Sequence, residues 1–329
     1  MNALNESLYE GHAGIALYFL ELYKKTQIDS YLEAYKKSIN TAINESKYNN
    51  IFSAYSCRLS VVFPILSEIS YFGTSEHQFL IEVVFQELNN KVKEIESLDW
   101  ISGLAGILAL AVTSYEVLGD SFYLDIAEVI ANEVLHKQAK EKFDKVGLGH
   151  GCTGLALALF KIYQHTPLEI YKSTAIEILN REKQIMNSKD YEKQSKWCWG
   201  TTGIGMGKIE ILKIYKNNEI LIDIYDLIED IELDLKADDC ICHGNFGDIE
   251  FLNQLQIHQL GSNTERILEE KINSVFLYKN INNQFSVKRL PEIESFDLFT
   301  GLSGIGYELL RLDSPTAVSN VYTLTINKP

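Results

Sequence analysis

The segment "HGCTGLALALFKIY", residues 150–163, places two glycines three positions apart and follows them with an almost wholly apolar run. A helix that is apolar nearly all round must be buried on every side. The pattern recurs as "EGHAGIALYFL" from residue 10, "SGLAGILALAV" from 102, "WGTTGIGMGKI" from 199, "HGNFGDIEFLN" from 243 and "TGLSGIGYELL" from 300. The repeat, rather than any single motif, therefore decides the fold.

The spacing of the repeats reveals one further, degenerate copy. Successive first glycines are separated by 92, 48, 49, 44 and 57 residues, so the first gap is about twice the others. Near its midpoint stands "SCRLSVVFPIL", in which Cys57 and Ser60 replace the two glycines. Seven copies then cover nearly the whole chain, which predicts a single domain over residues 1–329.

Between the apolar runs lie longer amphipathic segments rich in Glu and Lys. Examples are "YLEAYKKSINTAINES", "FYLDIAEVIANEVLHKQ" and "ILIDIYDLIEDIELDLK". Their apolar residues recur at helical spacing, so they predict an outer layer of helices around a buried inner layer. No long stretch alternates as a half-buried strand does, and the short C-terminal "VYTLTI" stays unassigned.

Seven helical hairpins can form an open solenoid or a closed ring. An open solenoid needs polar caps on its terminal units. The first and last copies here are as apolar as the middle ones. We therefore expect an all-α fold, an α,α-barrel of about seven hairpins whose G-x-x-G turns open the inner helices. The glycines would allow close backbone approach there, and in some copies a positive φ.

Composition narrows the function classes. The formal net charge of −15 argues against a nucleic-acid-binding protein, whose surface would be basic. The longest apolar runs are far short of the roughly 20 residues that a membrane span needs, and the N-terminus lacks a secretion signal, so we expect a cytoplasmic protein. In that reducing compartment the five cysteines are buried thiols, metal ligands or catalytic groups rather than disulfides.

Equivalent positions of the copies should lie around one rim of a closed barrel. Cys198 and Cys242 both stand two positions before a first glycine, and His150 and His243 both stand one position before. Cys198, Cys242 and His243 can then converge on one ion, with His150 on the neighbouring copy. Two thiolates and an imidazole suit zinc, and three protein ligands leave a position open, as catalytic zinc sites do.

The alternatives for these residues are buried thiols and ordinary helix-start residues. Cys240 competes as a ligand because it lies two residues before Cys242. We expect Cys57 and Cys152 to serve only in packing.

The motifs "GHGCTG", "WCWG" and "CHGNFG" closely resemble those of the lanthionine synthetase C-like family, an α,α-barrel family, and the resemblance runs from Tyr9 to about Leu312. The ending "DLFTGLSGIGYELLRLDSP" looks most like the C-terminal cyclase domain of bifunctional class II lanthipeptide synthetases. The resemblance implies a zinc site made of Cys198, Cys242 and His243.

The resemblance also implies a catalytic His150 and a functional Asp99. Asp99 would orient the imidazole, and its alternative role is a helix N-cap. Two positions depart from the family pattern: Gln194 stands where an arginine is often found, and Trp199 where Tyr or His is common. These departures concern the acid–base machinery rather than the metal.

The activity that the resemblance implies is addition of a peptide cysteine thiol to dehydroalanine or dehydrobutyrine, which closes a thioether ring. Zinc would hold the thiol as thiolate, and His150 would deliver the proton that completes the addition. The expected partners are a dehydrated precursor peptide (leader plus core) and a dehydratase domain or protein. Because the chain starts close to its first repeat, we expect an excised domain or a stand-alone cyclase.

Two other classes stay open at this point. One is another thiol-activating zinc α,α-barrel, similar to the protein prenyltransferase catalytic subunit, although those barrels usually bind zinc through Asp, Cys and His. The other is a non-catalytic peptide-binding scaffold that keeps zinc for structure.

Overall fold

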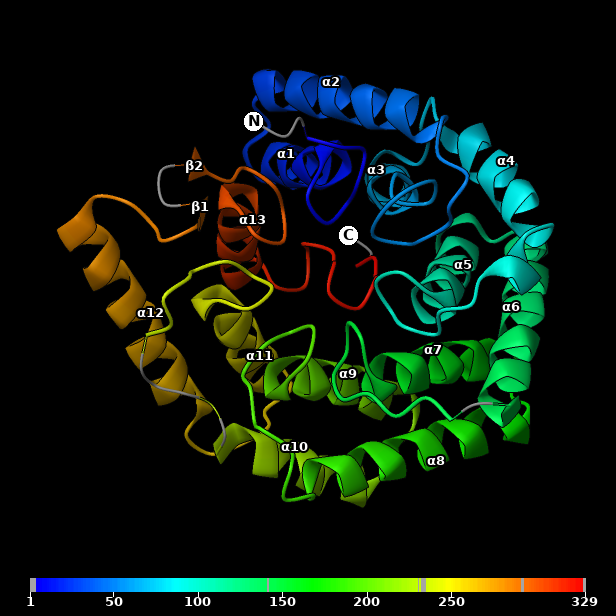
Figure 1. Cartoon of the computed structure of the whole chain (residues 1–329). Helices are drawn as coiled ribbons and strands as arrows, with labels where there is room; N and C mark the ends of the chain where they lie inside the picture. Colours follow the sequence, from blue (N-terminus) through cyan, green and yellow to red (C-terminus); the bar gives the residue numbers. More distant parts are fainter. Residues whose placement is uncertain (1–3, 141, 230, 232–234, 291–292, 328–329) are drawn as a thin grey trace.

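Two concentric rings of helices make up the computed structural model, which describes residues 4–140, 142–229, 231, 235–290 and 293–327 (Figure 1). The inner ring consists of α1 (His12–Thr26), α3 (Val62–Phe72), α5 (Leu104–Leu118), α7 (Cys152–His165), α9 (Thr201–Ile214), α11 (Asn245–Ile257) and α13 (Leu302–Asp313). The outer ring consists of α2 (Asp29–Ser46), α4 (Gln78–Asn89), α6 (Ser121–Lys140), α8 (Glu169–Met186), α10 (Asn218–Glu229) and α12 (Thr264–Asn282). The α,α-barrel predicted from the repeats is confirmed.

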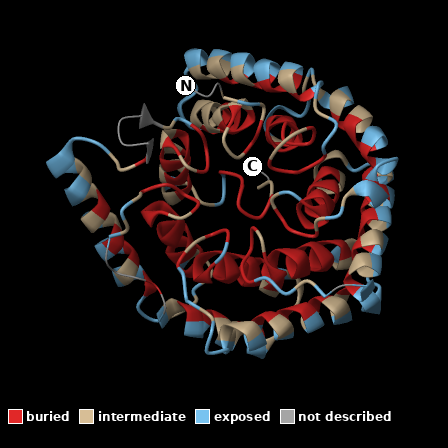
Figure 2. Cartoon of the chain, in the orientation of Figure 1, coloured by how far each residue is buried: buried red, intermediate tan, exposed pale blue. Residues whose placement is uncertain are grey.

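The apolar runs form the buried inner helices, and the amphipathic segments form the outer helices, which are buried on one side (Figure 2). In α5 every residue from Leu104 to Ser114 is buried, as expected of a helix that is apolar all round. In α2 the buried residues include Tyr35, Ile39, Ala42 and Ile43, one stripe at spacings of four, three and one that faces the inner ring. The segment "ILIDIYDLIEDIELDLK" forms α10 over its first part, and residues 230 and 232–234 lie outside the described residues.

A circle of hydrogen bonds at one mouth of the barrel links each copy to the next. The carbonyl two positions before each first glycine, or its equivalent in copy two, accepts a bond from the preceding copy. The seven bonds are Tyr9 N to Tyr55 O (3.0 Å), Ser53 Oγ to Ile101 O (2.6 Å), Ile101 N to Gly149 O (3.1 Å), His150 N to Cys198 O (3.1 Å), Trp197 N to Cys242 O (2.8 Å), Cys242 N to Phe299 O (3.1 Å) and Phe299 N to Tyr9 O (3.0 Å). Because the last bond returns to the first copy, the ring is closed.

The last copy differs from the other six. Its inner helix α13 is followed by a tail, residues 314–327, that enters the centre of the ring instead of forming an outer helix (Figure 1). The segment "VYTLTI" lies in this tail, where an isolated bridge pairs Asn320 with Thr325. Away from the barrel, the short strands β1 (Lys288–Leu290) and β2 (Ile293–Glu294) pair antiparallel.

Copy two, which lacks both glycines, keeps the turn but delays the helix. Arg58 N donates to Ile51 O at 3.1 Å, the bond that the other copies make at the same register. Cys57 adopts a φ of +63° and α3 begins only at Val62. The loss of the glycines therefore shortens one inner helix without opening the ring. Among the described residues, no helix combines the length and apolar character needed to cross a membrane.

Candidate active site

The mouth lined by the hydrogen-bond circle brings the two predicted cysteines together. The Sγ atoms of Cys198 and Cys242 are 3.5 Å apart, and both cysteines are free. Cys198 precedes α9 and Cys242 precedes α11, so equivalent turns of adjacent copies place the two thiols side by side. The phenol of Tyr9, at the same register in copy one, donates to Cys242 Sγ at 2.9 Å.

The two thiols differ in acidity. The pKa of Cys198 is lowered because Cys242 donates a hydrogen bond to its sulfur, an effect that outweighs burial, and His150 adds a favourable charge. The pKa of Cys242 is raised well above its usual value, because it is the donor of this bond and is almost completely buried. Cys198 is therefore the more acidic thiol of the pair.

The spacing of the sulfurs suits a shared metal ion rather than a disulfide. A disulfide needs sulfurs about 2.05 Å apart. Two thiolates bound at about 2.3 Å to one tetrahedral zinc lie about 3.8 Å apart. The observed 3.5 Å therefore needs only a small adjustment to fit zinc.

His243, the third predicted ligand, groups with different residues. Among the described residues, one set of ligand atoms lies within 4.8 Å of one another, and it belongs to Asp238, Cys240 and His243. The pKa of His243 is lowered, chiefly by burial, which keeps the imidazole neutral and able to bind a metal. The structure thus places Cys198 next to Cys242, and places His243 next to Cys240, the competing cysteine.

His150 and Asp99 meet across the boundary between copies three and four. His150 Nδ1 lies 3.1 Å from Asp99 Oδ2. Asp99 also accepts from the backbone N–H of Ser102 at 2.6 Å and from its hydroxyl. Burial acts to raise the pKa of Asp99, but the hydrogen bonds from His150 and Ser102 outweigh it and lower that pKa. Asp99 is therefore a charged partner for the imidazole and also fixes the turn that leads into α5.

Two aromatic residues lie beside these groups: Trp199, which the sequence marked only as a departure from the family pattern, and Tyr9, to which it assigned no role. The indole of Trp199, half exposed, packs against the His150 ring with centroids 5.1 Å apart. Tyr9 stacks on Phe299 at 4.7 Å and points its hydroxyl at Cys242. Tyr9 shares the register of the two cysteines, so position within the repeat was the signal that could have identified it.

Comparison with known proteins agrees with this architecture. The family model described as "Lanthionine synthetase C-like protein" matches residues 2–323. Among solved structures, nisin cyclase matches with a TM-score of 0.71 and 17% sequence identity, over 98% of this chain and 92% of that one. No curated protein sequence matches the chain.

Two more distant structures also match. The Lin0763 protein from Listeria innocua gives a TM-score of 0.44 at 12% identity, over 95% of this chain and 82% of that one. A glycosyl hydrolase family 88 protein from Bacteroides vulgatus gives 0.45 at 13% identity, over 93% and 91%. The family model spans nearly all seven repeats, including the mouth that holds the paired cysteines and the His150–Asp99 pair. The chain belongs to the lanthionine synthetase C-like family.

Proposed function

We propose that this chain is a zinc-dependent lanthipeptide cyclase that acts as a single domain over residues 1–329. It would add peptide cysteine thiols to dehydroalanine or dehydrobutyrine, forming lanthionine and methyllanthionine rings. The observation that carries the proposal is the meeting of two free thiols, 3.5 Å apart, at the mouth that also holds the His150–Asp99 pair. Membership of the family supports the same reaction.

Cys198, Cys242 and His243 are the residues that we propose to hold the metal. Zinc at this position would supply a Lewis acid that keeps a substrate thiol deprotonated near neutral pH. The two sulfurs already lie together, and His243 follows Cys242 directly in the chain. Binding through this set would use His243 without Asp238 and Cys240, the residues with which it is grouped.

The chain's own acid–base group is His150. When the thiolate sulfur bonds to Cβ of the dehydro residue, the C=C double bond becomes single and Cα must gain a proton. His150 donates that proton from Nε2, because Nδ1 faces Asp99. Asp99 fixes the tautomer and stabilises the charged imidazolium, and the Trp199 indole packs at a tilt beside the ring.

The substrate that we propose is a dehydrated precursor peptide, with leader and core, made by a dehydratase domain or protein. One observation favours the prenyltransferase-like alternative. The Asp238–Cys240–His243 group has the Asp, Cys and His ligands expected of such a barrel. A non-catalytic scaffold would need neither His150 nor its charged partner. Identifying the metal ligands separates the cyclase from the prenyltransferase-like alternative, and an assay of ring formation separates it from the scaffold.

A matched pair of variants tests the metal set. Cys198→Ala should lose most bound zinc, because a removed thiolate leaves an incomplete site, whereas Cys240→Ala should retain it. Metal content of the purified proteins, measured by elemental analysis, provides the readout without any assay of activity. The opposite result, zinc lost only from Cys240→Ala, would assign the ion to Asp238, Cys240 and His243.

The reaction itself is tested with a synthetic peptide that contains one cysteine and one dehydroalanine. The parent protein with zinc should convert the free thiol to a thioether, seen as loss of alkylation by a thiol reagent with no change in peptide mass. A zinc-loaded protein that binds the peptide without forming the ring would identify a scaffold instead.

A further inference from the structure

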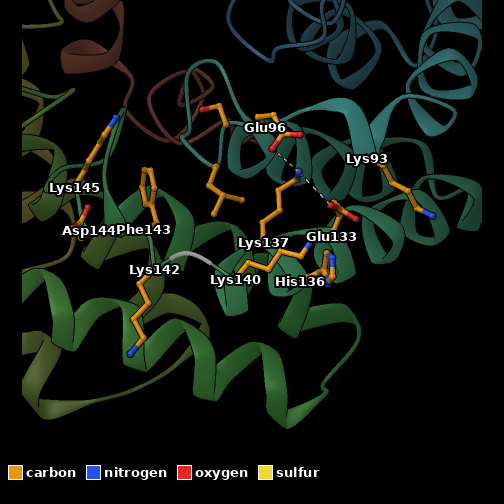
Figure 3. Close-up of a pocket in the computed structure, with 12 residues that line it drawn as sticks. Lys93, Glu96, Glu133, His136, Lys137, Lys140, Lys142, Phe143, Asp144 and Lys145 are labelled. Carbon is orange, nitrogen blue, oxygen red and sulfur yellow. Dashed lines mark hydrogen bonds and ion pairs between the residues drawn. The ribbon is translucent and has the colours of Figure 1, made fainter.

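A basic groove lies beside the His150–Asp99 pair, and nothing in the proposed reaction uses it. Its volume is about 820 Å³, within the range of small-molecule sites. It lies between the outer and inner rings, where the end of α6 faces the two turns that open α5 and α7 (Figure 3). Its described lining comprises Lys93, Glu96, Ser97, Leu98, Glu133, His136, Lys137, Lys140, Lys142, Phe143, Asp144 and Lys145.

The charge of this groove is opposite to that of the whole protein. Its described lining has five lysines against three carboxylates, in a chain with a formal net charge of −15. Lys137, at the centre of the groove, is neutralised by Glu96 at 3.2 Å and Glu133 at 3.5 Å (Figure 3). Lys142 faces Glu177 at 3.6 Å. The remaining lysines therefore carry the positive charge of the groove, and exposed Asp144 is the remaining carboxylate of its lining.

Three exposed lysines on the rim of the groove supply that positive charge: Lys93, Lys140 and Lys145. Lys93 and Lys145 lie at opposite sides of the groove in Figure 3, with Lys140 between them. Charges that are spread in this way match an extended ligand with several carboxylates better than one compact anion. Half-buried Phe143 adds apolar surface that the side chains of a peptide can cover.

The groove is within a few residues of the proposed reaction centre. Leu98 directly precedes Asp99, and Lys145 lies five residues before His150, so their Cα atoms are at most about 18 Å apart. Ser97 O accepts from Leu104 N at 2.9 Å and Lys145 O accepts from Cys152 N at 2.8 Å, so the same turns position the groove and the catalytic pair. A peptide held in the groove can reach the centre with a short extended segment.

We propose that this groove binds an acidic segment of the peptide substrate and so holds the reacting residues at the mouth of the barrel. This inference rests on the proposed cyclase function. Exposed lysines act here through long-range attraction, so the groove should raise the local concentration of substrate without taking part in the chemistry. Its effect should appear in KM and in binding, and should weaken with salt.

Binding is tested with two fluorescent peptides that differ only in a run of six glutamates or six glutamines, measured by anisotropy at low ionic strength. The glutamate peptide should bind at least about tenfold more tightly to the parent protein. The triple variant Lys93→Glu/Lys140→Glu/Lys145→Glu should lose this preference. The control Lys36→Glu/Lys37→Glu/Lys216→Glu changes the net charge equally, at exposed lysines outside the groove, and should retain it.

Three results would overturn the inference: equal binding of both peptides, an unchanged preference in the groove variant, or equally tight binding of a single-stranded oligonucleotide of the same charge. A second measurement separates the groove from the reaction. When the acidic run is attached to a peptide with cysteine and dehydroalanine, it should lower KM for the parent but not for the groove variant, with kcat unchanged. Ring formation without any preference for glutamate refutes the groove alone, whereas preferential binding without ring formation refutes the cyclase alone.

Discussion

Asp99 shows how one residue combines a repeated structural role with a local functional one. Four positions before the first glycine of its copy, it closes a turn by accepting from the N–H three residues on. Ser7, Ser53 and Asp297 close the same turn in their copies. Asp99 differs from them because it also contacts His150 of the next copy. Asp99 is not the helix N-cap that the sequence left open, because Gly103 holds that position and α5 has no side-chain cap bond. Its contact with His150 fits the orienting role, which stays a prediction.

Removal of the proposed acid should slow the chemistry and spare the metal. His150→Ala is expected to keep its zinc and to form thioether about 10²–10⁴-fold more slowly, the usual contribution of a positioned proton donor. Asp99→Asn should keep the turn but shift the pH–rate profile, because the imidazolium loses its charged partner. Asp297→Asn is the matched control, since it changes the same turn without a contact to His150. A full rate in His150→Ala would exclude its role as acid.

The ionised Asp99 carboxylate also predicts a dependence of stability on pH. Its pKa is lower in the folded protein than the usual 3.8, so its charge stabilises the fold above that pH and this contribution is lost as the pH falls through the folded value. Asp99→Asn should lower the free energy of unfolding by about 1–3 kcal/mol at neutral pH, as expected for hydrogen bonds to a charged group. Urea unfolding at several pH values should show the difference shrinking below pH 3.8; a constant difference would contradict this assignment.

At the scale of the element, each inner helix except α3 begins where it does because its two glycines let a preceding segment of backbone pass close to the helix. At the second glycine of six copies, an added Cβ would lie between 1.8 and 2.7 Å from the carbonyl oxygen six residues earlier. The first glycines of the same copies have φ between −144° and −102°, so close approach rather than positive φ explains them. Because the backbone can come this close, the turn that contains Cys198, or its equivalent, packs against the N-terminus of the inner helix.

Gly203→Ala tests this packing. The new methyl would stand 1.8 Å from Trp197 O, so the turn that carries Cys198 must move. We expect a loss of about 1–3 kcal/mol in unfolding free energy, as for an overpacked core, together with weaker zinc binding. Gly119→Asn is the control, since that glycine has open space around it and a left-handed φ of +71° that Asn tolerates. Equal stability of the two variants would show that the second glycine is not needed for close approach.

At the scale of the whole molecule, the tail that follows α13 fills the barrel from its centre. Tyr55 donates to Val321 O at 2.7 Å, and Thr113 on α5 donates to Leu324 O at 2.6 Å. Tyr322 packs against Trp197, with ring centroids 6.1 Å apart, so the tail supports the residue next to Cys198. The closed ring thus encloses a filled core rather than an open channel at this level.

Arg311 anchors the start of this tail. Fully buried on α13, it donates to the carbonyls of Val318 and Ser319 at 2.8 and 2.9 Å and to Glu250 of α11 at 2.6 Å. Burial acts to raise the pKa of Glu250, but the charge of Arg311 outweighs it and lowers that pKa. The pKa of Glu308 is raised by burial and by Glu250, so Glu308 stays protonated and the cluster holds one charged pair.

Loss of Arg311 should be costly because it leaves the Glu250 charge buried without its partner. Arg311→Met is expected to lower the unfolding free energy by roughly 3–5 kcal/mol. Arg266→Met, which removes the exposed pair with Glu270, should cost less than about 1 kcal/mol. Both values come from thermal or urea unfolding, and a similar small cost for both variants would show that Arg311 does not hold the tail.

The sequence by itself determined the barrel, its seven-fold repeat and the shared register of Cys198 and Cys242. These follow from local rules, because a steric requirement at the glycines and the period of a buried helix are set by neighbouring residues. The resemblance carried by its motifs also pointed to His150 and Asp99, and a closed ring makes the two copies that hold them neighbours.

Only the tertiary structure decided which side chains meet at the mouth. It placed the hydroxyl of Tyr9 on Cys242, grouped His243 with Asp238 and Cys240, and directed the tail into the barrel. The Tyr9–Cys242 contact and the tail contacts join residues more than two hundred positions apart, so they depend on closure of the ring. The Asp238–Cys240–His243 group lies within one turn and depends on side-chain rotamers. No local pattern encodes the long-range contacts, because they exist only once the ring has closed.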